Sequence, residues 1–125
     1  MNNSELEQLC QYWQKQLGIQ DWDITVKFGI PQGNNIASTT THLNYMEAII
    51  TIMNDEDYKK LHTTPMGERQ PIESDLIHEL LEVMFDVIRR EHDQDSKDYR
   101  WEQCFNKLAK SLNNLSNYEG NNNES

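Results

Sequence analysis

Residues 72–88, with the sequence IESDLIHELLEVMFDVI, decide the fold of this chain. Apolar side chains recur there every three or four positions, which is the period of an α-helix with a buried face. Pro71 suits the first position of such a helix, and Arg89 and Arg90 place positive charge where its C-terminus would be. We therefore predict a long helix from residue 72 to about residue 90.

The segment at the N-terminus has the same period. Residues 4–17 carry apolar side chains at helical spacing, and Gly18 follows as the residue that ends the helix. Ser4 and Glu7 have the spacing of a capping box, in which each side chain bonds the other residue's backbone N–H. We predict a helix over residues 4–17 with this cap.

Three strands are expected next. Residues 22–30 alternate apolar and polar side chains, which indicates a half-buried strand. Residues 36–43 are rich in Thr and Ser and predict a polar strand. Residues 45–53 are apolar on both faces, which favours a central position. The sequence thus predicts a three-stranded antiparallel sheet that helices must cover.

The remaining elements complete an α+β fold. Residues 55–61 begin with three acidic side chains and predict a short helix, and residues 97–115 predict the last long helix, with Ser96 as its N-cap. Loops are expected at residues 63–70 and 91–95. The polar residues 117–125 predict a disordered tail, so a single domain would cover residues 1–116.

The composition restricts the classes of function. The 125 residues carry a formal net charge of −10, which opposes direct binding to a nucleic-acid backbone. The polar N-terminus lacks the pattern of a signal peptide, and no apolar run reaches the ~20 residues of a membrane span. Two cysteines far apart in sequence form no disulfide framework. We expect a cytoplasmic protein that does not enter a membrane.

The centre of the long helix holds the chemistry. His78 and Glu79 begin the sequence His-Glu-Leu-Leu-Glu, which differs by one residue from the zinc-binding pattern His-Glu-x-x-His. In that pattern two imidazoles one turn apart bind the metal, and the Glu activates a water molecule. Here Glu82 occupies the second ligand position, on the same helix face as His78. We expect His78 to border the core, and Glu79, Glu82 and two nearby aspartates, Asp75 and Asp86, to face a cleft or solvent.

The order of short motifs along the chain resembles a family. Trp13 with Leu17-Gly18, then residues 21–24 (DWDI), 45–50 (YMEAII), 73–81 (ESDLIHELL) and Trp101-Glu102 are similar to the small zincin-like metallopeptidases of phage and prophage genomes, the minimal gluzincins. The resemblance covers about residues 13–112. It implies a zincin-like fold, a zinc ion and a peptide or protein substrate.

The resemblance also implies roles for individual residues. His78 matches the first metal ligand, Glu79 the general base, and Glu102, on the next helix, the third ligand. Glu82 departs from the family pattern and is the expected second ligand. One imidazole with two carboxylates is a harder donor set than two imidazoles with one, so manganese, magnesium or calcium compete with zinc, and a site without metal is the remaining alternative.

Two functions follow from these observations. The first is metal-dependent hydrolysis of peptide bonds. The second is a non-catalytic acidic protein on a zincin scaffold that has lost its metal. Such a protein would bind a host factor or inhibit a defence protein, and its negative charge could imitate that of a nucleic acid. Glu82 and the charge of −10 favour the second function, and His78, Glu79 and Glu102 favour the first.

Glu82 and Glu102 can also be explained without a functional role. Glu82 has the character of a solvated surface carboxylate, and Glu102 complements the positive end of a helix dipole. The other three histidines, at positions 42, 62 and 92, have no partner at ligand spacing. The three tryptophans, at positions 13, 22 and 101, are expected in the core.

Overall fold

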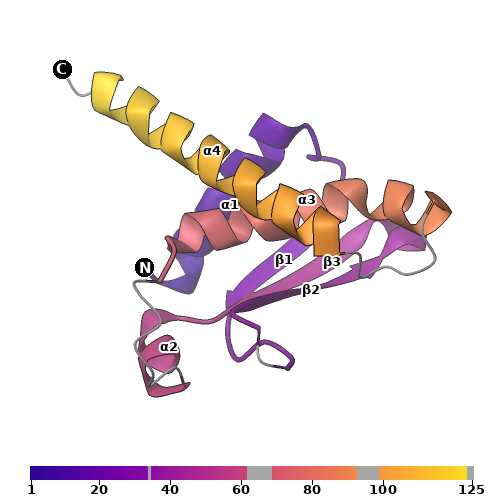
Figure 1. Cartoon of the computed structure of the whole chain (residues 1–125), viewed down its shortest axis with the longest axis horizontal. Helices are drawn as coiled ribbons and strands as arrows, with labels where there is room; N and C mark the ends of the chain where they lie inside the picture. The colour runs from indigo at the N-terminus through magenta and orange to yellow at the C-terminus, as the bar shows by residue number, and fades with distance from the viewer. Residues whose placement is uncertain (34, 62–68, 93–98, 124–125) are drawn as a thin grey trace.

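The computed structural model describes residues 1–33, 35–61, 69–92 and 99–123 (Figure 1). The predicted N-cap at Ser96 and residues 63–68 and 93–95 of the two predicted loops lie outside these residues, whereas residues 91 and 92, also predicted as loop, belong to a helix. The described elements confirm the α+β class. They are, in order, α1 (Asn3–Leu17), β1 (Asp23–Phe28), β2 (Ala37–His42), the short 3-10 helix η1 (Leu43–Tyr45), β3 (Glu47–Ile52), α2 (Asp55–Leu61), α3 (Ile72–His92) and α4 (Tyr99–Asn123).

The last helix is longer than predicted. It continues through Asn123, into the segment 117–125 for which the sequence predicts a disordered polar tail. The division into a domain of residues 1–116 and a tail stays a prediction.

The start of α1 is capped two residues earlier than predicted. The side chain of Asn2 accepts the backbone N–H of Glu5 at 2.8 Å, and the carboxylate of Glu5 accepts the N–H of Asn2 at 3.1 Å. The predicted Ser4–Glu7 box is therefore wrong, because Asn2 and Glu5 make the same exchange and lengthen the helix. The predicted end is confirmed, since Gly18 adopts a left-handed conformation with φ 72°.

The sheet is mixed, so the prediction of an antiparallel sheet is wrong. The strand order is β1-β3-β2, with β1 parallel and β2 antiparallel to β3. The central position of β3 is confirmed. Its side chains Ala48, Ile50 and Ile52 are buried, whereas the polar β2 takes an edge. β2 and β3 form a hairpin through η1, and β1 pairs with the other side of β3, where its direction is parallel.

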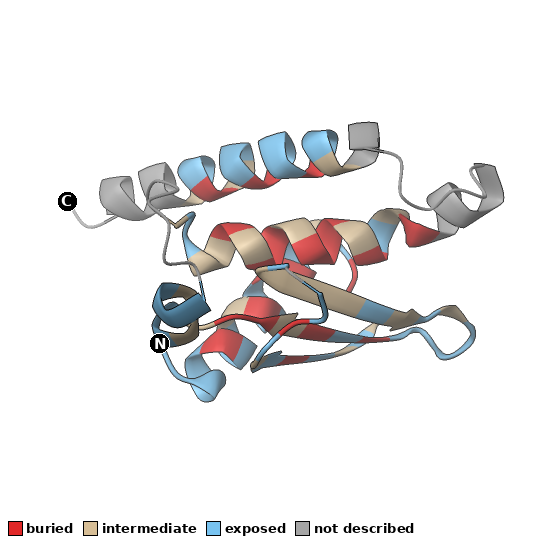
Figure 2. Ribbon diagram, turned by 60° about the horizontal axis from the view of Figure 1, so that its bottom comes forward, coloured by how far each residue is buried: buried red, intermediate tan, exposed pale blue. Residues whose placement is uncertain are grey.

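One face of the sheet is covered by two helices. α1 contacts β1, and α3 contacts β2 and β3, while α4 packs on the other side of α3 (Figure 2). Helix α3 therefore lies between the sheet and α4, and most of its apolar side chains are buried. The core joins residues of all these layers: Leu6, Cys10, Trp13, Ile19, Val26, Ile50, Ile52, Leu76, Ile77, Leu80, Leu81, Phe105 and Ala109.

A buried arginine fastens α2 to α3, which the sequence analysis did not foresee. Arg69 forms ion pairs with Asp55 at 3.0 Å and with Asp75 at 3.5 Å, and it also donates to the carbonyl of Met53. Its guanidinium lies 5.3 Å from the centre of the Tyr58 ring. These contacts occupy Asp75, one of the carboxylates expected to face a cleft.

None of the described helices combines the length and the apolar character that crossing a membrane requires.

The corrected cap gives a test of the fold. We expect Asn2→Ala to lower the free energy of unfolding by about 1 kcal/mol, because it removes the acceptor of the Glu5 N–H. Ser4→Ala is the matched control and should leave stability nearly unchanged, since Ser4 lies inside the helix. Urea denaturation of both variants checks this. A larger loss in Ser4→Ala than in Asn2→Ala would restore the original prediction.

Candidate metal centre

His78 lies on the side of α3 that faces α4. Its Nε2 atom is 3.0 Å from Oε2 of Glu102 on α4 and 3.6 Å from Oε1 of Glu82, one turn further along α3. The ring of Phe105 meets the imidazole edge-on, with ring centres 5.9 Å apart. The structure thus brings together the three residues that the sequence analysis selected as metal ligands.

Glu79 completes the cluster from the side of the sheet. Its carboxylate accepts a hydrogen bond from the hydroxyl of Thr39 on β2. Donor atoms of His78, Glu79 and Glu82 all lie within 4.8 Å of one another. The predicted general base therefore adjoins the predicted ligands.

Two carboxylates of α3 do not face a cleft or solvent, contrary to prediction. Glu79 is only 5% exposed and Asp86 only 4% exposed. The helical period correctly placed both residues beside the apolar face of α3. It could not show that β2 and α4 pack on either side of that face and leave little of α3 open to solvent.

The cluster opens to solvent on the α4 side. The side chain of Glu102 is 42% exposed, whereas those of His78 and Glu82 are 14% and 19% exposed. A small ligand or substrate would therefore reach the cluster past Glu102, and Glu79 lies at its inner end.

The proximity of three carboxylates changes their protonation. Burial and the neighbouring Glu82 raise the pKa of Glu79 well above its usual range. Burial and Glu82 also raise the pKa of Glu102 to about 7. Burial would raise the pKa of Glu82 too, but hydrogen bonds with His78, Glu102 and Glu79 lower it to about 2. Glu82 is therefore the carboxylate that stays charged.

The imidazole responds to the same carboxylates. Burial alone would lower the pKa of His78, but the hydrogen bond with Glu82 and the charges of Glu79, Glu82 and Glu102 raise it to about 9. Without a cation, the cluster therefore retains protons at neutral pH, because three carboxylates this close cannot all be charged.

The donor set fits a divalent cation. Tetrahedral ligands bonded at about 2.0–2.1 Å are separated by about 3.3 Å, and the distances from His78 to Glu102 and Glu82 lie on either side of that value. His78, Glu82 and Glu102 would hold the ion, and three carboxylates supply more negative charge than the ion carries. His78 Nδ1 is buried without a hydrogen-bond partner among the described residues, so this site lacks the usual support of a ligating histidine.

The other candidates lie apart from the cluster. His42 is exposed at the end of β2. His62 and the side chains of His92 and Trp101 lie outside the described part of the chain. Of the remaining tryptophans, Trp13 is buried, and its Nε1 donates to Glu73 on α3 at 2.7 Å, whereas Trp22 is only half-buried.

Sequence reasoning missed two residues that shape the cluster. Thr39 holds Glu79, and Phe105 packs against His78. The position of Phe105 near the cluster could have been predicted, because Phe105 lies three positions after Glu102 and so on the same side of α4. The position of Thr39 could not, since one threonine in a Thr-rich strand does not show which helix the strand contacts.

The proton content of the cluster predicts how stability depends on pH. The pKa values of Asp75 (3.8 to about 6, mainly by burial), Glu102 (4.5 to about 7) and His78 (6.5 to about 9) are all raised. The folded protein therefore binds more protons than the unfolded chain between about pH 4 and pH 9, and stability should fall as the pH rises through that range. The lowered pKa of Glu82 acts only below about pH 4.5.

Denaturation midpoints of the chelator-treated protein at pH 5, 7 and 9 measure this dependence. We expect a steady decrease, and a smaller slope in Glu82→Gln, which removes a charge that raises the pKa values of His78 and Glu102. Stability that is constant or rises over this range would contradict the proton assignment.

The hydrogen bond from Thr39 gives a further test. Thr39→Val keeps the shape of the side chain but leaves a buried carboxylate oxygen without its donor, so we expect a loss of about 1–3 kcal/mol in the free energy of unfolding. Thr39→Ser retains the hydroxyl and should lose less. Thermal or urea denaturation distinguishes them, and equal stability of Thr39→Val and the wild type would show that the bond contributes nothing.

Comparisons of the chain with protein-family models, with curated proteins and with solved structures found no match. We therefore argue the function from the side-chain geometry.

Proposed function

We propose that this chain is a zincin-like, metal-dependent peptidase of the small phage type, which acts on a peptide or protein substrate in the cytoplasm. The observation that carries the proposal is the convergence of His78, Glu82 and Glu102 from two helices, with Glu79 beside them. Zinc is the ion that the resemblance implies, and the carboxylate-rich donor set favours manganese as the alternative.

The residues of the cluster divide into two roles. His78, Glu82 and Glu102 would hold the cation, which when bound would supply Lewis acidity toward water and a peptide carbonyl. Glu79 accepts a proton from the attacking water and returns it to the leaving amine. Thr39 donates a hydrogen bond to one oxygen of Glu79, which holds this carboxylate beside His78 and Glu82.

One observation favours the second function, a non-catalytic acidic protein that binds a host or defence protein. The 3.0 Å contact joins His78 directly to Glu102, so these two predicted ligands satisfy each other without an ion. A net charge of −10 supplies the attraction for a basic partner.

Calorimetry with Zn²⁺ and Mn²⁺ separates the two functions. We expect the wild type to bind one ion per chain, and Glu82→Gln to weaken this at least tenfold because a charged ligand is lost. Glu47→Gln, at an exposed position on β3, is the matched control and should bind as the wild type does. Glu82→His should increase the affinity for zinc.

Hydrolysis of a peptide library by the metal-loaded protein completes the test. Glu79→Gln should keep the metal and lose about 10²–10⁴-fold in rate. A wild type that binds neither ion, beside a Glu82→His variant that does, would overturn the enzyme and leave the acidic binding protein.

A further inference from the structure

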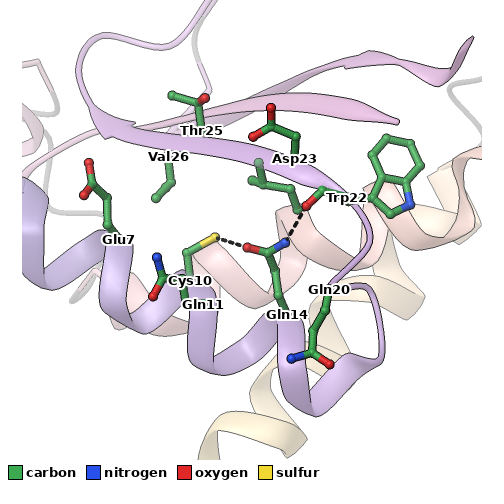
Figure 3. A pocket seen from close by; sticks show the side chains of 10 residues that line it. Glu7, Cys10, Gln11, Gln14, Gln20, Trp22, Asp23, Thr25 and Val26 are labelled. Atoms are coloured by element: carbon green, nitrogen blue, oxygen red, sulfur yellow. Dashed lines mark hydrogen bonds between the residues drawn. The ribbon is translucent and has the colours of Figure 1, made fainter. Parts of the chain in front are cut away.

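A second site lies at the opposite edge of the sheet from the metal cluster. Because the strand order is β1-β3-β2, β2 with Thr39 is one edge and β1 is the other. A hollow of about 350 Å³ runs between β1 and α1, bordered by residues 23–26 of the strand and by Glu7, Gln11 and Gln14 of the helix (Figure 3). Side chains of adjacent strand residues point to opposite faces, so four consecutive residues bordering one hollow show that the strand presents its backbone edge.

The hydrogen bonds of β1 reveal which backbone groups face that hollow. Asp23 and Gly29 donate their N–H groups inward to Met46 and Ile52. Since N–H directions alternate along a strand, residues 24, 26 and 28 direct their N–H and C=O groups away from β3. Ile24 and Val26 are thus the outward residues within the hollow.

Both ends of this outward row are already capped by side chains of α1. Asn3 accepts a hydrogen bond from the N–H of Phe28 at 3.0 Å. Gln14 donates to the carbonyl of Trp22 at 3.0 Å, a bond that Figure 3 shows. Each amide side chain makes the bond that a neighbouring strand would make. Between the caps, no described residue bonds the outward groups of Ile24 and Val26, but Val26 is only 3% exposed, so the accessible groups are those of Ile24.

The lining favours one kind of occupant. Glu7 and Asp23 are exposed carboxylates at the hollow, within a chain of net charge −10. A second copy of the chain would bring the same carboxylates against themselves, and like charges oppose such pairing. Basic side chains in an extended segment would instead meet carboxylates while its backbone meets β1.

The cysteine beneath the hollow adds no chemistry. Cys10 is buried, and its Sγ lies 3.7 Å from the side-chain oxygen of Gln14. Burial raises the pKa of its thiol to about 11, so it stays a neutral side chain. The hollow is suited to docking and not to nucleophilic reaction.

We propose that the groove between α1 and β1 binds an extended, basic peptide segment of a partner protein, which adds to the sheet as a strand beside β1. The segment forms backbone hydrogen bonds with the outward N–H and C=O groups of Ile24, and its Lys or Arg side chains pair with Glu7 and Asp23. Residues 22–26 span about 13 Å at about 3.3 Å per residue, so about five residues of the partner enter the groove. This surface is independent of the metal cluster.

Amide NMR with two synthetic peptides tests the proposal. One is a capped seven-residue peptide of alternating lysine and threonine, and the other replaces each lysine with glutamate. We expect the basic peptide alone to shift the amide resonances of Ile24 and Val26. Its N-methylated form, which lacks backbone donors, should bind at least tenfold more weakly.

Variants of the full chain locate the binding. Ile24→Pro removes one outward N–H and spares the bonds to β3, so it should weaken binding at least tenfold, whereas Ile24→Val keeps the N–H and should bind normally. The double variant Glu7→Lys and Asp23→Lys, at exposed positions, should invert the preference to the acidic peptide even if Ile24→Pro fails to fold.

Four results would overturn the proposal. They are an absence of shifts at Ile24 and Val26 with millimolar basic peptide, equal binding of both peptides, unchanged affinity in a folded Ile24→Pro, and shifts at these amides caused by self-association alone. The last result would assign the groove to a second copy of the chain.

Discussion

The burial of α3 on both of its sides is the constraint on which the rest of the structure depends. Leu76, Ile77, Leu80 and Leu81 are at most 2% exposed, because the sheet covers one side of the helix and α4 the other. Such packing fixes the rotation of the helix about its axis. Once that rotation is fixed, His78 must face α4 and Glu79 must face β2.

The same packing concentrates charge that would otherwise disperse into water. Three carboxylates and one imidazole share a region where burial raises the pKa values of Glu79 and Glu102. A cluster of this kind lowers stability unless protons or a cation neutralise it. Stability alone therefore gives no reason to keep it, and groups held at such a cost are characteristic of functional sites.

Much of the fold followed from local patterns. The helical period aligned His78 with Glu82, whereas the resemblance of the sequence to a family pointed to Glu102 on the next helix. The parallel pairing of β1 with β3 could not be predicted, because a local pattern identifies strands but not their order. The burial of Glu79 depends on Thr39, 40 residues earlier, and no spacing in the sequence connects the two.

The mixed sheet separates the candidate metal cluster from the proposed peptide groove, because they lie at opposite edges. With β3 in the centre, each outer strand has one free edge, and a free edge attracts further strands unless it is covered. The two ends of the β1 edge are closed by Asn3 and Gln14, both from α1. Between them, Val26 is only 3% exposed, and no hydrogen bond of the described residues reaches the outward groups of Ile24. The side chains of α1 therefore protect most of this edge from further strands, and Ile24 is the position at which the proposed partner segment would pair with it.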